Sequence, residues 1–212
     1  VIEYSGFTFL LIDALDSLNV DKVQFNNAVI VDGKDPDFIR QIVRRIRSNN
    51  SPDIYLKPIF ILKGINIIDP FVNKLVDGTI FSLEQIEFIV PTVEKILTKV
   101  NDLKFTNSIS FEAQMIEKTI NFMYTCDVYD LEPVPYVYAG INYSYPILSV
   151  NFRQSEEYIV LDILDIAERE GIFESEYFDR IYLCSNCSNG HLTYREVCPK
   201  CGSSNSTTED IV

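Results

Sequence analysis

The stretch AVIVDGKDPDFIRQIVRRIR, residues 28–47, decides the fold of the first half of the chain. Its opening run, Ala28 to Val31, is continuously apolar, which is typical of a strand buried on both faces, and Asp32-Gly33 forms a turn after it. From Pro36 to Arg47 the apolar residues recur at i, i+3, i+4 and i+7, so they form one face of a helix. A buried strand that leads directly into an amphipathic helix indicates a parallel α/β sheet.

The flanking segments continue the same alternation of strands and helices. Phe7 to Ile12 is a short apolar run that predicts a strand, although Asp13 to Leu15 could equally begin a helix. Further along, the sequence predicts a buried strand at Ile54 to Leu62, a short helix at Asp69 to Leu75, a turn at Asp77-Gly78 and a last strand at Thr79 to Phe81. We therefore expect residues 1–81 to form an α/β domain with a partial parallel sheet.

Residues 82–125 are expected to be a helical connector. Ser82 with Gln85 three residues later matches a capping box. The apolar residues that follow have the alternating spacing of a coiled-coil seam: Leu83, Ile86, Val90, Val93, Leu97 and Val100. Pro91 should kink or restart this helix. The seam fits two alternatives, a helical hairpin within one chain or a homodimer formed through residues 83–100.

Residues 126–212 differ in character from the rest of the chain. Prolines and tyrosines alternate over residues 127–152, which is typical of extended edge strands and turns. A helix is predicted from Ser155 to Gly171, since glycine commonly follows a helix C-terminus. Tyr177 to Leu183 then continues as a β-like extension. These elements predict a small α+β domain of winged-helix type, with a metal-binding ribbon at residues 182–204.

The ribbon sequence LCSNCSNGHLTYREVCPKCGSS, residues 183–204, contains two CxxC pairs. The segment between the pairs is long enough to run out and back as a hairpin, which brings four thiolates together. Soft sulfur ligands in this arrangement suit tetrahedral Zn²⁺ and exclude Mg²⁺ and Ca²⁺. The spacing disfavours the alternatives of two disulfides or of cysteines that only pack. The predicted zinc ligands are Cys184, Cys187, Cys198 and Cys201, and a site closed by four protein ligands is structural.

The remaining histidine and cysteine are expected to lie outside the metal site. His191 is the only histidine, and we interpret it as a surface turn residue because the four thiolates already saturate the metal. Cys126 is the fifth cysteine and is expected to be buried. An odd cysteine count beside a zinc signature indicates a reducing compartment, so we expect a cytoplasmic protein. The sequence shows neither a long apolar run nor a basic leader, and we expect no membrane span and no signal peptide.

The chain is strongly acidic, which bears on its partners. Its formal net charge is −13, and four thiolates with one Zn²⁺ would add about −2. Between Ser155 and Arg180, nine acidic residues stand against two arginines. Because a field of this sign repels nucleic acid and anionic membranes, we expect neither as a partner. One helix face is basic in this otherwise acidic chain and contains Arg40, Arg44 and Arg47. We interpret it as the solvated face of an amphipathic helix rather than as a patch that binds an anion or a partner.

The run AVIVDG, an Arg-ending helix, KPIFIL and then VDGTI resembles the later half of a response-regulator receiver domain. In that family the aspartate after the third strand takes the phosphoryl group, which would be Asp32. Lys63 stands where the family has Ser or Thr, and Ser82 lies near the place of the family's lysine. Asp13 and Asp16 could stand in for the acidic pair, but they are too close to Asp32 for the intervening strand and helix. We therefore expect a degenerate receiver in which Asp32 is a turn residue.

Four phrases of the second half carry another resemblance: YPIL at 145–148, the helix that ends at Gly171, FDRIYLCSNC at 178–187 and HLTYREVCPKCGS at 191–203. Together they are similar to the thaumarchaeal output domain family, a winged-helix-like module with a zinc ribbon, over residues 126–212. That family commonly follows sensor or receiver domains, which agrees with the receiver-like first half.

These features predict a non-enzymatic signal-transduction module that acts through contacts with signalling proteins. The first alternative is a DNA-binding transcription regulator, suggested by the winged-helix and ribbon architecture. The second is an enzyme, for which the sequence offers no nucleophile–base pair, open metal site or phosphate loop.

Overall fold

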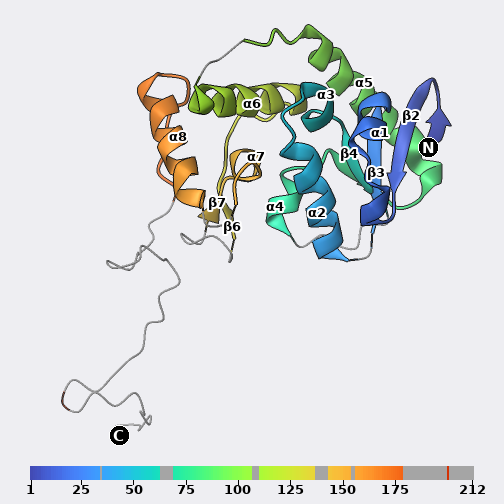
Figure 1. Cartoon of the computed structure of the whole chain (residues 1–212), viewed down its shortest axis with the longest axis horizontal. Helices are drawn as coiled ribbons and strands as arrows, with labels where there is room; N and C mark the ends of the chain where they lie inside the picture. The colour runs from blue at the N-terminus through green and yellow to red at the C-terminus, as the bar shows by residue number, and fades with distance from the viewer. Residues whose placement is uncertain are drawn as a thin grey trace, which may run out of the picture.

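The computed structural model describes residues 1–33, 35–62, 69–106, 110–136, 143–153, 156–178 and Lys200, apart from the side chain of Glu157. Within these residues a five-stranded sheet at one end is joined through a long helix to a smaller helical region at the other end (Figure 1). In chain order the elements are β1 (Ile2–Tyr4), β2 (Phe7–Ile12), η1 (Leu15–Ser17), α1 (Val20–Phe25), β3 (Ala28–Asp32), α2 (Pro36–Arg47), α3 (Pro52–Tyr55), β4 (Ile59–Leu62), α4 (Pro70–Asn73), β5 (Gly78–Ile80), η2 (Leu83–Gln85), α5 (Ile86–Asp102), α6 (Phe111–Cys126), β6 (Val134–Pro135), β7 (Tyr143–Ser144), α7 (Pro146–Ser149) and α8 (Glu157–Arg169).

The β3–α2 unit follows the sequence pattern closely. Residues 28–31 of β3 are fully buried, as expected for a strand covered on both faces. The carboxylate of Asp35 accepts a hydrogen bond from the Asp37 backbone N–H at 3.1 Å and so caps the N-terminus of α2. Pro36 occupies the first turn, where its missing N–H costs nothing.

The strands lie in the order β1-β2-β3-β4-β5, with β1 antiparallel to β2 and the other neighbours parallel. Flavodoxin-like folds have the order 2-1-3-4-5, and removing their second strand leaves 1-3-4-5. The strands β2, β3, β4 and β5 of this protein would correspond, in that order, to strands 1, 3, 4 and 5 of such a fold. The antiparallel strand β1 lies at the edge of the sheet, beyond β2. An α/β first half with a mostly parallel sheet is therefore confirmed, and its topology is compatible with a receiver that lacks one strand–helix unit.

Helices cover both faces of the sheet. The face with Val29, Val31 and Ile61 packs against α1, α2, α3 and α4. The opposite face, with Ile30 and Phe60, packs against α5. Alternate residues of one strand thus enter two separate cores, which explains why the parallel strands read as continuous apolar runs.

Helix α5 corrects three expectations about the connector. It continues through Pro91 as one helix. The predicted capping box is wrong, because the side-chain oxygen of Gln85 accepts a hydrogen bond from the Phe81 backbone N–H at 2.9 Å and, among the described residues, the Ser82 side chain makes no cap bond. The buried stripe of α5 contains Ile89 and Ile96 besides two of the predicted seam residues, and much of it packs on the sheet, while α5 also contacts α6.

This packing uses the apolar face of α5 within one chain. Val90 and Leu97 of the predicted seam are partly buried against the same sheet face, and Leu83 is 38% exposed. The contacts of α5 with α6 and with the sheet agree with the alternative of a helical hairpin packed within its own chain. A homodimer through residues 83–100 stays a prediction.

One further expectation about the first half is wrong. The segment Ile54 to Leu62 is not one strand, because Pro52 starts the short helix α3 and the strand β4 begins only at Ile59. Pro58 lies between the two elements and forces an extended residue before it. The sequence analysis also missed the helix α1 and the edge strand β1.

The second half is organised by α6, which contacts α5, α7 and α8. Its residues Phe122 and Met123 belong to the core shared with α2, and its residues Met115 and Ile116 belong to a separate core with α7 and α8. The predicted helix at 155–171 is confirmed as α8. It ends at Arg169, and Gly171 follows the C-cap with φ +69°. The Gly171 and Ile172 amides donate to the carbonyls of Glu168 at 2.9 Å and Ala167 at 2.8 Å in a Schellman motif. None of the described helices is long and apolar enough to cross a membrane.

Candidate functional site: a buried polar network between the two halves

The predicted zinc ligands Cys184, Cys187, Cys198 and Cys201 lie outside the described residues, as do His191 and Lys63. Within the described part of the chain, no group of three or more His, Cys, Asp or Glu side chains could hold a metal ion. The site that the described residues do define is a set of buried polar contacts between the α/β half and the region that begins with α6. We call Arg44, Arg47, Asp77, Lys118 and Cys126 the coupling network.

Arg47, the last residue of α2, lies at the centre of this network and is 2% exposed. Its Nε donates to the Leu75 carbonyl at 2.8 Å, and its Nη1 donates to the carbonyls of Tyr55 at 2.7 Å and Lys57 at 2.8 Å. Its Nη2 donates to Asp77 Oδ2 at 2.8 Å, in an ion pair with that carboxylate. The guanidinium also lies over the ring of Phe122 in α6, 4.8 Å from the centroid. One side chain therefore joins the ends of α2, α3 and α4 to α6.

Asp77 extends these contacts to the C-terminus of α6. Its Oδ2 also accepts a hydrogen bond from the Ile59 backbone N–H at 2.7 Å, and its Oδ1 accepts the Cys126 S–H at 3.3 Å. Burial, with the neighbouring Asp77 carboxylate as the second cause, raises the pKa of the Cys126 thiol well above its ordinary value. Cys126 is thus a free, partly buried thiol whose surroundings favour the protonated form.

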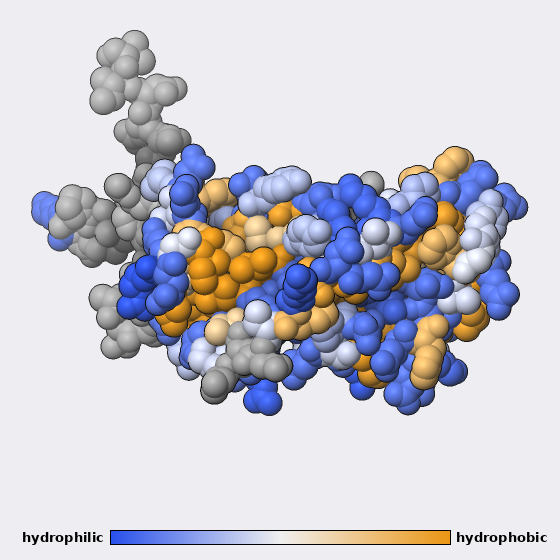
Figure 2. Space-filling view, turned by 90° about the horizontal axis from the view of Figure 1, so that it is seen from above, coloured by the Kyte–Doolittle hydropathy of each residue, from blue (hydrophilic) through white to orange (hydrophobic). Residues whose placement is uncertain are grey.

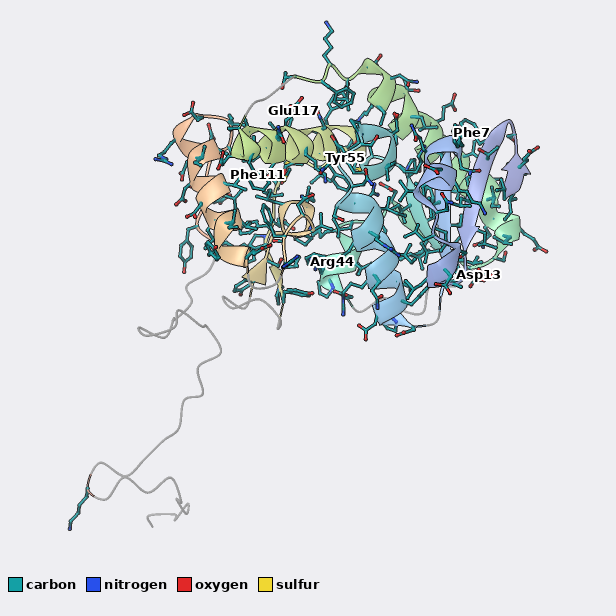
Figure 3. All side chains as sticks on the ribbon, in the orientation of Figure 1. Phe7, Asp13, Arg44, Tyr55, Phe111 and Glu117 are labelled. Atoms are coloured by element: carbon teal, nitrogen blue, oxygen red, sulfur yellow. The ribbon has the colours of Figure 1, made fainter. Side chains whose placement is uncertain are left out.

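Arg44 makes a second connection, one turn earlier on α2. Its Nη2 donates to the Phe152 carbonyl at 2.8 Å, in the segment between α7 and α8. Its guanidinium lies over the ring of Phe71, 5.3 Å from the centroid, and that ring stacks on Tyr136 at 4.9 Å. Figure 3 shows Arg44 on the side of α2 that is turned toward α7.

The arginines of α2 were therefore wrongly interpreted as a solvated face. Arg40 is ion-paired with Asp69 and Asp37, both at 2.7 Å, Arg44 is partly buried, and Arg47 is buried. Of the four, Arg45 is the one whose side chain is exposed. The sequence did contain a signal for Arg47, since it follows Val43 by four residues and Ile39 by eight and so lies on the apolar stripe of the helix.

Lys118 connects α6 to two other segments from a buried position. Its Nζ donates to the Asn49 carbonyl at 2.7 Å and to Asn151 Oδ1 at 2.5 Å, and it lies over the Tyr55 ring, 4.8 Å from the centroid. Burial, together with the positive charge of Arg47, lowers the pKa of Lys118 to about 7. Beside it, the Asn121 amide donates to the Tyr55 hydroxyl at 3.4 Å.

The receiver-like positions lie at the other end of the sheet. Asp32 ends β3, and the register that pairs Ile12 with Val31 brings Asp13 next to it at the carboxyl edge. A Cβ at Gly33 would lie 2.3 Å from the Phe38 ring, so any larger residue there would require this ring to shift.

The fold and the network define an α/β half, with a sheet order compatible with a receiver, that is joined to a helical region. A protein-family model, thaumarchaeal output domain 1, matches residues 107–212. The chain belongs to this family. The match begins before α6, so it takes in the helix that the sequence analysis assigned to the connector. Comparisons with curated proteins and with solved structures gave no match.

Proposed function

We propose that this protein is a non-enzymatic signalling output module whose receiver-like half and output region move as one rigid unit and act through contacts with other proteins. The observation that carries the proposal is the position of Arg47. Its guanidinium makes four hydrogen bonds to the α/β half and lies over the Phe122 ring of α6 in the family region, and both regions contribute to one apolar core. A state change in the first half would therefore displace α6 as well.

The zinc ribbon is the second part of the proposal. Cys184, Cys187, Cys198 and Cys201 supply four thiolates, a donor set that fits Zn²⁺ and leaves no position for water or substrate. Bound zinc would supply folding free energy to the ribbon, on the order of 10–16 kcal/mol for sites of this kind, and no reaction step. The ribbon would then present a rigid surface at the end of the output region.

Charge supports protein partners over nucleic acid. The arginine face of α2 was the one basic exception in the chain, and Arg40, Arg44 and Arg47 are engaged with carboxylates, carbonyls and rings of the same chain. Phosphate binding needs Lys and Arg side chains that are free to neutralise charge. A formal net charge of −13 adds a general repulsion.

Metal analysis and a DNA titration on the full chain test this proposal together. We expect one zinc per chain in freshly purified, reduced protein, and no anisotropy change with a mixed-sequence duplex at micromolar protein in low salt. Cys198→Ser should lose the zinc while the described α/β half keeps its unfolding transition. Salt-sensitive DNA binding that disappears in Arg195→Ala with Lys200→Ala would favour the transcription-regulator alternative. Purified protein that contains no zinc would contradict the proposal that residues 182–204 form a zinc ribbon.

A further inference from the structure

A groove of about 560 Å³ lies between α6, α8 and the segment that precedes α6. Its apolar lining comes from Ala113, Ile116, Ile120, Ile166 and Ile172. Figure 2 shows hydrophobic side chains gathered on this face of the molecule, over α6 and α8. A volume of this size is in the range of sites that accept a ligand or a few side chains of a partner.

The groove has a firm floor and an open top. Ile116 is 5% exposed and belongs to the core between α6 and α8. Ile120 and Ile172 at the opening are 39% and 45% exposed. Packing against α8 fixes the floor, so the apolar surface above it is preformed rather than assembled on binding.

The rim of the groove is acidic. Glu112, Glu117 and Glu170 line it, against a single cation, Lys104. Glu117 is held in place because both its carboxylate oxygens accept hydrogen bonds from Thr106, at 2.6 Å from the backbone N–H and 2.7 Å from the hydroxyl. A partner that fits this surface would place apolar side chains in the floor and Lys or Arg side chains at the rim.

We propose that the groove between α6 and α8 binds a basic amphipathic helix of a signalling partner. The inference rests on the proposed function, since it names the kind of protein contact through which the module would act. A helix laid in a groove is a common way to recognise such a segment, with apolar anchors at i, i+3 or i+4 and i+7. A second copy of this chain is a poor occupant, because every copy carries a net charge of −13 and the segment from Ser155 to Arg180 has nine acids to two arginines.

A model peptide tests the inference on the full chain. The probe is a helix of about sixteen residues with Leu on one face, Lys on the other and one Trp among the Leu residues, which is a helix-in-groove pattern. The protein contains no Trp, so a blue shift of the peptide fluorescence reports burial of its apolar face. A peptide of identical composition, with the Leu residues distributed around the helix, measures attraction by charge alone.

We expect saturable binding of the amphipathic peptide, with an affinity at least about tenfold above that of the redistributed peptide, as two well-buried anchors would provide. Ile120→Ser with Ile172→Ser should lower the affinity by about tenfold or more. Phe88→Ser is the matched control, because Phe88 is 69% exposed on α5, away from the groove, and it should leave the affinity unchanged. Glu112→Gln with Glu170→Gln should weaken binding and flatten its dependence on salt.

Equal affinity for both peptides, or equal affinity of the groove variant and the wild type, would overturn the inference. So would a dimer in light scattering that Ile120→Ser converts to a monomer, since a second copy would then occupy the groove. These results are distinguishable from failure of the proposed function, which shows itself as DNA binding or as protein without zinc. Circular dichroism of each variant checks that these exposed substitutions leave the fold intact.

Discussion

Helix α2 of the α/β half and helix α8 of the output region have similar lengths and both show the apolar period of a helix packed on one face. Their charged residues are used differently. The carboxylates of α8, such as Asp162 and Asp165, are exposed, whereas Arg44 and Arg47 of α2 reach carbonyl oxygens in other elements. A guanidinium has five donors on a long apolar stem, so it can be buried if every donor finds an acceptor. The comparison teaches that the period of a helix predicts its buried face but not whether a charged residue beside that face is solvated.

The largest effect expected from this difference is at Arg47. Arg47→Met should lower the free energy of unfolding by about 3–5 kcal/mol, because Asp77 and three carbonyl groups would stay buried without their donor. Arg45→Met, two residues earlier and exposed, should change it by no more than about 0.5 kcal/mol. Urea unfolding of both variants measures the contrast, and a similar small loss in both would show that α2 has a solvated face after all.

On α8 the free energy of unfolding should depend on the residues of the apolar face rather than on the charged residues. Ile163 is 1% exposed in the core with α6 and α7, so Ile163→Ala should cost about 2–4 kcal/mol. Asp165→Asn on the exposed face of the same helix should stay within about 0.5 kcal/mol of the wild type. A loss at Asp165 as large as that at Ile163 would mean that α8 also buries a charged contact.

An effect of a different kind, one that depends on pH, is expected at Lys118. Its pKa is about 7 in the folded protein, against 10.5 for an ordinary lysine. Below pH 7 the Lys118 amine is charged in both the folded and the unfolded protein, so the folded state bears the full free-energy cost of burying the charge. Between about pH 7 and 10.5 the unfolded chain binds more protons than the folded chain, so the free energy of unfolding should rise with pH by at most about 1.4 kcal/mol per unit.

Lys118→Met should remove that rise, and the difference between the two proteins isolates it from other titrations. Lys74→Met is the control, because Lys74 makes an exposed ion pair with Glu132 and should retain the full slope. The test fails for Lys118 if the wild type and Lys118→Met show parallel stability curves from pH 7 to 10.

The smallest effect is expected where β3 passes into α2. Asp32 should not be phosphorylated by acetyl phosphate with Mg²⁺, because Ser82 occupies the region where a receiver has its lysine. Mass spectrometry of the intact protein should show no gain of a phosphoryl group. A gain that is lost in Asp32→Asn would show that this half is a working receiver.

The sequence predicted the elements whose signals are local. The apolar run of β3, the period of α2 and the glycine after α8 all correspond to structure at the expected residues. The boundary between α3 and β4 was missed because one continuous apolar stretch serves both a buried helix and a buried strand. The predicted winged-helix and ribbon details remain predictions, as do the four zinc ligands, which lie outside the described residues.

The coupling network could not be predicted because its partners are distant in sequence. Arg47 and Asp77 are thirty residues apart, and Lys118 and Asn49 are sixty-nine apart. The first bond is set by how α2 lies beside the segment between α4 and β5, and the second by how α6 lies beside the end of α2, and both are properties of the whole fold. A charged residue on an apolar stripe was the one local sign, and at Arg47 it was present.

The central claim is that the α/β half and α6 open as one unit. Native-state hydrogen exchange tests it most directly, by comparing the slowest amides of β3, such as Ile30, with those of α6, such as Phe122. The account predicts equal opening free energies in the two elements, and an equal decrease in both in Arg47→Met. Amides of α6 that open at much lower free energy than those of β3, and that do not respond to Arg47→Met, would contradict it.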